Sequence, residues 1–116
     1  MTGALPKAKP RIDHPQELER MVRQIVEKVD PLAIYLFGSR ARGDGDADSD
    51  YDLLIVVPDD FPADQATPAR AFELIEGRRI PMDAVLVRKH RFAWRSNEVG
   101  TLSYKVAREG VALYER

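Results

Sequence analysis

The chain has 116 residues, no cysteine and a formal net charge of −1, with 44% hydrophobic and 32% charged residues. This composition indicates one soluble globular domain with a single core, and it excludes disulfides and thiolate metal sites. The near-neutral charge also argues against direct nucleic-acid binding by bulk electrostatics. No apolar run is long enough to span a membrane, and the N-terminus lacks the apolar segment of a secretory signal, so we expect a cytoplasmic protein without membrane contact.

The first third of the chain predicts a tail, a helix and a strand. Residues 1–13, rich in proline and basic side chains, indicate a loosely held tail, and residues 14–116 a single domain. Residues 15–29 have apolar side chains at helical spacing, and Pro31 ends this helix because it pushes the preceding residue out of helical geometry. Residues 32–37 are apolar throughout, which predicts a strand in the centre of a sheet.

A glycine-rich loop connects this strand to a second one at residues 53–57. Gly38 directly follows the first strand, and residues 39–42 predict a short helix that the next glycines end. The backbone N–H groups and the hydroxyl of Gly38-Ser39 can hold phosphate oxygens, as glycine-rich turns before helices do in other proteins. The loop between the strands is therefore a candidate phosphate-binding site.

Two aspartates lead into the second strand. Side chains alternate between the faces of a strand, so Asp50 and Asp52 are expected to point to the same side. Neighbouring carboxylates repel each other unless a cation lies between them, and oxygen ligands of this kind suit Mg²⁺. The structural alternative, a turn acid beside an edge-strand acid, is less favourable because a charge entering an apolar strand is costly without a partner. The pattern predicts a site for a metal–nucleoside triphosphate complex.

Other charged residues of the loop allow simpler interpretations. Asp44, Asp46 and Asp48 are interpreted as solvated loop acids, because the glutamate that an EF-hand needs at its twelfth position is absent. Arg40 and Arg42 could neutralise phosphate charge as nucleotide-binding residues. They could equally pair with the loop aspartates or face water, and the sequence leaves both interpretations open.

The second half of the chain predicts another helix and strand. A proline- and acid-rich connection leads to Thr67, a plausible N-cap, and to a helix that ends at Gly77. A helix between two strands is the usual crossover of a parallel or mixed sheet. Residues 80–87 predict the third strand, and Asp83 is its only acid. Asp83 lies either at the exposed start of this strand or in the metal site, as a third carboxylate.

The last part of the chain begins with a basic and aromatic segment at residues 88–96. Phe92 and Trp94 are expected to pack on the core or to meet a protein partner, although stacking on nucleic acid is conceivable. Residues 102–108 predict a short helix, and residues 111–114 a short strand or packed tail.

The loop and its flanking strands resemble a known family signature. The chain contains, in this order, Gly38-Ser39, Ala41-Arg42-Gly43, Ser49-Asp50 and Asp52-Leu53. These residues resemble the signature G-S-x-A-R-G…S-D-x-D-L of the DNA polymerase β-like nucleotidyltransferase superfamily. The chain is most similar to the small, stand-alone minimal nucleotidyltransferases (MNT). The resemblance implies an α/β (α+β) nucleotidyltransferase fold, with a small mixed β-sheet flanked by helices.

The same resemblance implies a catalytic site and its cofactors. Asp50, Asp52 and Asp83 would be the catalytic acids and the ligands of Mg²⁺, with two ions bound, and Asp83 would also draw the acceptor hydroxyl toward the α-phosphate. Gly38 and Ser39 would bind the outer phosphates of ATP. Such enzymes act mainly by positioning and charge neutralisation.

The resemblance also implies a partner. MNT proteins are commonly paired with a helical HEPN ribonuclease in toxin–antitoxin modules of the type VII kind, so a hetero-oligomer is expected. Our leading hypothesis is an antitoxin that transfers AMP from ATP to a tyrosine hydroxyl of its HEPN partner. Two alternatives stay open: an antitoxin that neutralises its partner by binding alone, and a nucleotidyltransferase for a small molecule such as an aminoglycoside.

Overall fold

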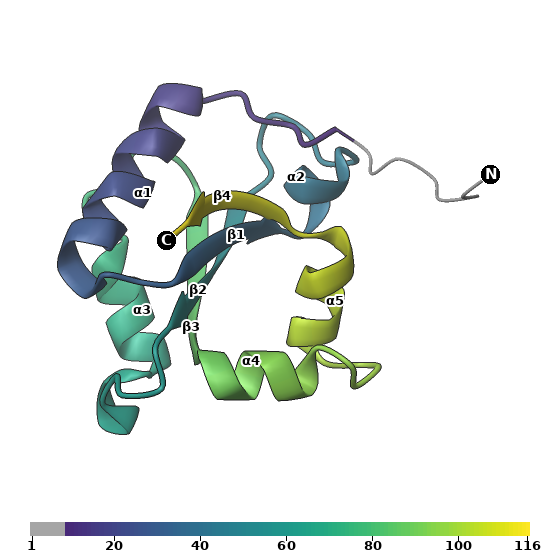
Figure 1. The fold of residues 1–116 in the computed structure, drawn as a ribbon. Coiled ribbons are helices and arrows are strands. Elements are labelled where there is room, and N and C mark those ends of the chain that lie inside the picture. Colours follow the sequence, from purple (N-terminus) through teal and green to yellow (C-terminus); the bar gives the residue numbers. More distant parts are fainter. Residues whose placement is uncertain (1–8) are drawn as a thin grey trace.

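A four-stranded mixed β-sheet forms the centre of the protein in the computed structural model, which describes residues 9–116 (Figure 1). In spatial order the strands run β3-β2-β1-β4. β1 pairs antiparallel with β2 and β4, whereas β2 and β3 are parallel. The bounds are Ala33–Phe37 for β1, Tyr51–Val57 for β2, Met82–Arg88 for β3 and Val111–Glu115 for β4. The predicted α/β class with a mixed sheet, and the central place of the first strand, are confirmed.

Helices cover both faces of this sheet (Figure 1). The larger core lies on the side of α1 and α3, and a smaller one lies on the side of α4 and α5. Side-chain alternation along β2 explains the division, because Leu53 and Ile55 face the first core and Leu54 and Val56 the second. The helices are α1 (Pro15–Val29), α2 (Ser39–Arg42), α3 (Pro68–Leu74), α4 (Lys89–Arg95) and α5 (Leu102–Glu109), with a 3₁₀ turn at η1 (Ala63–Gln65).

Helix α3 forms the crossover between the two parallel strands. The hydroxyl of Thr67 accepts a hydrogen bond of 3.1 Å from the backbone N–H of Arg70, so the predicted N-cap is confirmed. The helix ends at Leu74, three residues before the predicted end at Gly77. This connection brings the beginning of β3 beside the beginning of β2.

Helix α4 is an element that the sequence did not predict, as is the short 3₁₀ turn η1. The ring of Phe92 in α4 stacks on the ring of Tyr35 in β1, with 5.8 Å between the ring centroids and 16° between the ring planes. The side chain of Asp59 accepts a hydrogen bond of 2.8 Å from the backbone N–H of His90, in the first turn of the helix. Both partners are more than thirty residues away along the chain, so local periodicity gave no sign of them. Trp94, by contrast, is 64% exposed.

The segment before α1 is held against the loop that precedes β2. The backbone N–H of Arg11 donates to the carbonyl oxygen of Arg40 at 2.7 Å. The backbone N–H groups of Asp13 and His14 donate to the Tyr51 hydroxyl at 2.9 and 3.1 Å. The sequence placed residues 11–13 in the loose tail, but these contacts attach them to the domain. Residues 1–8, the rest of that tail, lie outside the described residues.

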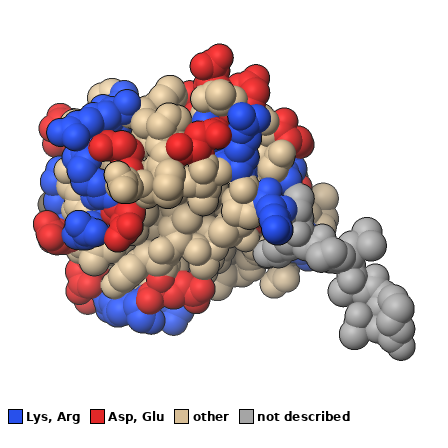
Figure 2. Space-filling view, turned by 90° about the horizontal axis from the view of Figure 1, so that it is seen from above, with Lys and Arg blue, Asp and Glu red and all other residues tan. Residues whose placement is uncertain are grey.

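The surface of the described residues carries charges of both signs. Seen from the side of α1 and β4, basic and acidic side chains alternate around an uncharged centre, as Figure 2 shows. This distribution agrees with the net charge of −1 and produces no broad field of one sign on this side. No helix within residues 9–116 has the length and apolar character needed to cross a membrane.

Candidate functional site

The pairing of three strands brings the predicted acids and the glycine turn to one end of the sheet. Phe37, the last residue of β1, pairs with Asp52 near the start of β2, and Asp52 pairs with Asp83 near the start of β3. Gly38 therefore follows β1 directly beside Asp52. Because Asp52 alternates with Leu53, whose side chain faces α1 and α3, both aspartates lie on the α4 and α5 face.

Gly38 makes a close backbone approach to the central acid. Its φ angle is +78° and its ψ angle −160°, a region that is essentially restricted to glycine. A Cβ atom built at this position would lie 2.5 Å from Oδ2 of Asp52. The turn thus needs glycine for two reasons, its backbone conformation and the space taken by the carboxylate.

Gly38→Ala is expected to lower the free energy of unfolding by more than the 1–3 kcal/mol that such backbone strain costs, because the new methyl group must also displace Asp52. Chemical denaturation of both variants would measure this. Gly77→Ala is the matched control, since Gly77 has a φ of +80° but open space around its Cβ position. Equal losses of stability in the two variants would contradict a tight contact between Gly38 and Asp52.

Burial and like charges act together on Asp52. Burial contributes most to raising the pKa of this carboxyl above its ordinary value, and the charges of Asp50 and Asp83 raise the pKa further. The guanidinium of Arg42 lowers the pKa of Asp52 and so opposes the shift only in part. Asp50 and Asp83 are themselves exposed. A cation bound among these oxygens would relieve the repulsion.

The three acids are neighbours without forming a ready-made metal-binding group. Within residues 9–116, no three Asp, Glu or His side chains converge closely enough to hold an ion. One oxygen of Asp83 accepts a hydrogen bond of 3.0 Å from the adjacent backbone N–H of Ala84. The oxygen-only donor set and the unrelieved repulsion at Asp52 nevertheless fit a hard divalent cation such as Mg²⁺.

The loop after β1 wraps around Ser39. Its carbonyl oxygen accepts backbone hydrogen bonds from Gly43, Asp44 and Gly45, at 2.9 to 3.3 Å. A Cβ atom at Gly45 would lie 2.9 Å from the hydroxyl oxygens of both Ser39 and Ser49, so this turn is closely packed. In the part of the chain that the structure describes, the Ser39 hydroxyl has no hydrogen-bond partner. It is therefore available to a phosphate oxygen.

Arg40 has a structural position in this loop. Its side chain is only 1% exposed, and its guanidinium lies 4.0 Å from the centroid of the Tyr51 ring. It donates hydrogen bonds to the carboxylate of Asp13 at 2.8 Å and to three backbone carbonyl oxygens, those of Arg11, Ala47 and Ser49, at 2.7 to 3.1 Å. These contacts give Arg40 a supporting position in the loop, one of the two interpretations that the sequence left open, and its role in nucleotide binding stays a prediction. The Arg40 hydrogen bond also lowers the pKa of Asp13.

Arg42 lies nearer to the acids and is partly exposed. Its guanidinium forms ion pairs with Asp44 at 3.1 Å and with Glu109, at the end of α5, at 3.3 Å. These two carboxylates raise the pKa of Arg42. The pairing matches one of the two interpretations that the sequence allowed, and the effect of Arg42 on the pKa of Asp52 keeps it among the candidate nucleotide-binding residues.

The remaining loop acids have local roles. Asp46 accepts hydrogen bonds from the backbone N–H of Asp48 at 2.9 Å and from the Ser49 hydroxyl at 3.3 Å, and its own N–H donates to that hydroxyl at 2.9 Å. All three carboxylates, Asp44 included, are on exposed residues. They shape and solvate the loop, as the sequence predicted.

The supports of the site are the residues that sequence reasoning missed. Asp13 and Tyr51 hold Arg40, and Glu109 holds Arg42. Asp13 and Glu109 lie 27 and 67 residues from their partners, so no local pattern connects them. Among these three supports, only Tyr51 has a local signal in the sequence, because it is an aromatic residue between two aspartates at the start of a strand.

Comparisons with known proteins agree with the fold. The family model of the nucleotidyltransferase domain matches residues 18–107. A solved structure of a nucleotidyltransferase candidate from Sulfolobus solfataricus is similar, with 21% identity, a TM-score of 0.60, and coverage of 87% of this chain and 79% of that one. A toxin–antitoxin structure with AMP-PNP is also similar, with 22% identity, a TM-score of 0.55, and coverage of 84% and 73%. No curated protein matched in sequence.

Proposed function

The chain belongs to the nucleotidyltransferase domain family, and we propose that it transfers AMP from ATP to a hydroxyl group of a partner protein, as the antitoxin of a toxin–antitoxin pair. The observation that carries this proposal is the strand pairing that places Gly38, Asp52 and Asp83 side by side. The similarity to a toxin–antitoxin structure with AMP-PNP supports both the biological role and an adenine nucleotide as substrate.

Each residue of the site has a role in this proposal. Asp50 and Asp52 would hold Mg²⁺ against the triphosphate, with Asp83 as a further ligand, because these carboxylates are neighbours whose repulsion a cation would relieve. The bound metal would supply positive charge that stabilises the attacking and leaving oxygens. Ser39, whose hydroxyl has no hydrogen-bond partner among the described residues, would bind an outer phosphate together with the backbone at Gly38. Arg42 would add positive charge beside them.

The proposed reaction is a single displacement at phosphorus. The acceptor oxygen attacks the α-phosphorus of ATP and forms a new P–O bond, while the bond from this phosphorus to the bridging oxygen of the β-phosphate breaks. The bridging oxygen keeps the bonding electron pair, so pyrophosphate leaves. The acceptor's hydroxyl proton passes to a carboxylate, for which we propose Asp83 because it is exposed on the open face of the sheet.

The proposed acceptor is a tyrosine of a helical HEPN ribonuclease, as the resemblance to minimal nucleotidyltransferases implies. The domain is small, and the acids lie on a face that α4 and α5 cover only in part. A macromolecular acceptor that brings its own binding surface suits such an open site.

The experiment is intact-protein mass spectrometry on the proposed HEPN partner, after incubation with the purified chain, ATP and Mg²⁺. We expect a gain of one or more AMP masses and no gain with Asp50→Asn, whose exposed side chain makes a folding defect improbable. Arg23→Ala, on the far side of the sheet in α1, is the control that should keep full activity. A tight complex with no added mass would replace the proposal with inhibition by contact alone, and the absence of both would point to a small-molecule acceptor.

A further inference from the structure

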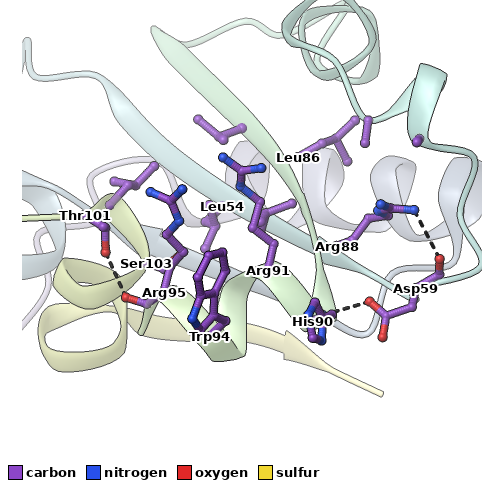
Figure 3. A pocket seen from close by; sticks show the side chains of 15 residues that line it. Leu54, Asp59, Leu86, Arg88, His90, Arg91, Trp94, Arg95, Thr101 and Ser103 are labelled. Atoms are coloured by element: carbon purple, nitrogen blue, oxygen red, sulfur yellow. Dashed lines mark hydrogen bonds between the residues drawn. The ribbon is translucent and has the colours of Figure 1, made fainter. Parts of the chain in front are cut away.

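A pocket of about 960 Å³ lies on the same face of the sheet as the acids. Its lining includes Leu54 of β2, which Figure 3 shows beneath α4, and the β3 residues Val85 and Val87, and these strand residues are called its floor here. These residues alternate along their strands with the same phase as Asp52 and Asp83, so the pocket continues the acid site along the strands. The end of the pocket at Leu54 and Val85 is therefore two residues along the strands from Asp52 and Asp83.

Basic side chains from α4 line one wall of this pocket. Figure 3 shows the guanidinium groups of Arg91 and Arg95 extending in the same direction, from the helix over the strands. Among the described residues, the side chain of Arg91 has no hydrogen-bond or ion-pair partner. The Nε atom of Arg95 is buried without a hydrogen-bond partner, and its nearest carboxylate, Glu98, is 3.8 Å away. A buried donor without a partner is costly, so this wall is built to receive an acceptor group.

The pocket also exposes apolar surface. Trp94 is 64% exposed, and Val85 and Leu102 are each 37% exposed. Arg95 also forms a long ion pair with Glu98 and lies over the Trp94 ring, at 5.3 Å from its centroid, so Arg91 is the freer of the two cations. Exposed apolar side chains beside these guanidinium groups favour a ligand that combines negative charge with an aromatic or aliphatic group. A tyrosine flanked by acidic residues has this combination.

We propose that this pocket binds the acceptor as an acidic polypeptide segment, with an aromatic side chain over the aliphatic floor and its carboxylates against Arg91 and Arg95. This proposal deepens the proposed function, because the transfer of AMP to the bound segment rests on that function. The segment would lie along the α4 and α5 face, so that its acceptor hydroxyl reaches Asp52 and Asp83. Arg91 and Arg95 are thus specificity residues for the acceptor and take no part in the chemical step.

The surroundings favour a polypeptide over nucleic acid. Asp50, Asp52 and Asp83 lie beyond one end of the pocket, and Asp59 lies in its lining. A phosphate backbone carries a negative charge at every nucleotide and would bring one next to these carboxylates, whereas a polypeptide can place an uncharged tyrosine there and keep its own carboxylates at the arginines. The floor is aliphatic, and the aromatic rings in the lining are those of Trp94 and His90, both on the side of α4, whereas single-stranded nucleic acid stacks on a series of aromatic platforms.

Binding can be measured apart from catalysis, because Trp94 is the only tryptophan of the chain and lies in the pocket. The probe is a glutamate–tyrosine copolymer, titrated while tryptophan fluorescence is recorded. We expect Arg91→Ala/Arg95→Ala to weaken binding of the copolymer at least tenfold and to leave the affinity for ATP with Mg²⁺ unchanged. The matched control, Arg23→Ala/Arg79→Ala, removes the same charge from two exposed arginines outside the pocket and should bind as the wild type does.

The readouts separate this inference from the proposed function. Arginine-dependent binding of the copolymer without any AMP transfer, to it or to the proposed HEPN partner, would keep the pocket assignment and reject the transferase proposal. If AMP is transferred and the double variant has the same acceptor KM as the wild type, the transferase proposal is kept and the pocket assignment is rejected. Weaker ATP binding by the double variant would make the pocket a nucleotide subsite and overturn the inference. Tighter binding of a single-stranded oligonucleotide than of the copolymer would also overturn it.

Discussion

Asp52→Asn is expected to abolish AMP transfer while making the ligand-free protein more stable. The carboxylate lies between Asp50 and Asp83 in a partly buried position, so its negative charge opposes folding unless a cation is bound. We expect the rate of transfer to fall by at least about 100-fold, the usual minimum for losing a group that stabilises transition-state charge. The free energy of unfolding should rise by about 0.5–1 kcal/mol, as is usual when surface charge is optimised.

The gain in stability should depend on pH in a defined direction. Because the pKa of Asp52 is raised in the folded protein, the folded state holds the proton more tightly than the unfolded state does. This residue's charge therefore lowers stability as pH rises through the folded-state pKa. Below about pH 3.9, the ordinary value for aspartate, both states are protonated and the penalty disappears. The advantage of the variant should be present at pH 7 and vanish on acidification.

Thermal unfolding of wild type and Asp52→Asn, with and without Mg²⁺, would measure this prediction. Added Mg²⁺ should raise the melting temperature of the wild type by binding only the folded state, and should raise that of the variant less. Asp64→Asn is the control, because it removes the same charge from an exposed acid in η1. A variant that is less stable than the wild type at pH 7 would show that Asp52 makes stabilising contacts that outweigh its repulsion.

Arg40→Ala is expected to destabilise the fold by about 3 kcal/mol, a large part of the stability of a small domain. The substitution leaves the carbonyl oxygens of Arg11, Ala47 and Ser49 without their donor and removes the cation that covers the Tyr51 ring. It also opens a cavity where a fully buried side chain was packed. Since these carbonyl groups belong to the segment before α1 and to the loop before β2, the site loses its support as well.

Urea denaturation at pH 7 would measure the loss. Arg40→Lys keeps the charge but cannot reproduce the planar set of donors, so it should recover only part of the stability. Arg23→Ala is the control, since its exposed pair with Glu19 contributes less than about 1 kcal/mol. A loss for Arg40→Ala as small as that of the control would reject the structural role of Arg40 and leave nucleotide binding as its predicted role.

Local sequence patterns account for most of the elements. The apolar periodicity of residues 15–29, the proline after them, the Thr67 cap and the glycine that ends α2 each act within one or two turns of chain, so each is visible in a short window. The acids at Asp50 and Asp52 were recognisable for the same reason. A charge that enters an apolar strand is unusual wherever the strand is later placed.

Contacts between distant residues decide the rest. Helix α4 forms where the local pattern was ambiguous, because Phe92 packs on Tyr35 and Asp59 caps the first turn. The two arginines of the motif look alike in sequence, yet Arg40 is buried against Tyr51, and Arg42 is partly exposed and pairs with Asp44 and Glu109.

The residues of this chain thus specify most of their own secondary structure and the chemical character of the site. Its geometry follows from strand pairing, since only the parallel register of β2 and β3 brings Asp83 beside Asp52. The same pairing places the pocket of Arg91 and Arg95 on the face of the acids. A side chain's chemistry is carried by the residue itself, whereas its neighbours depend on which distant segments bury each other's apolar surface.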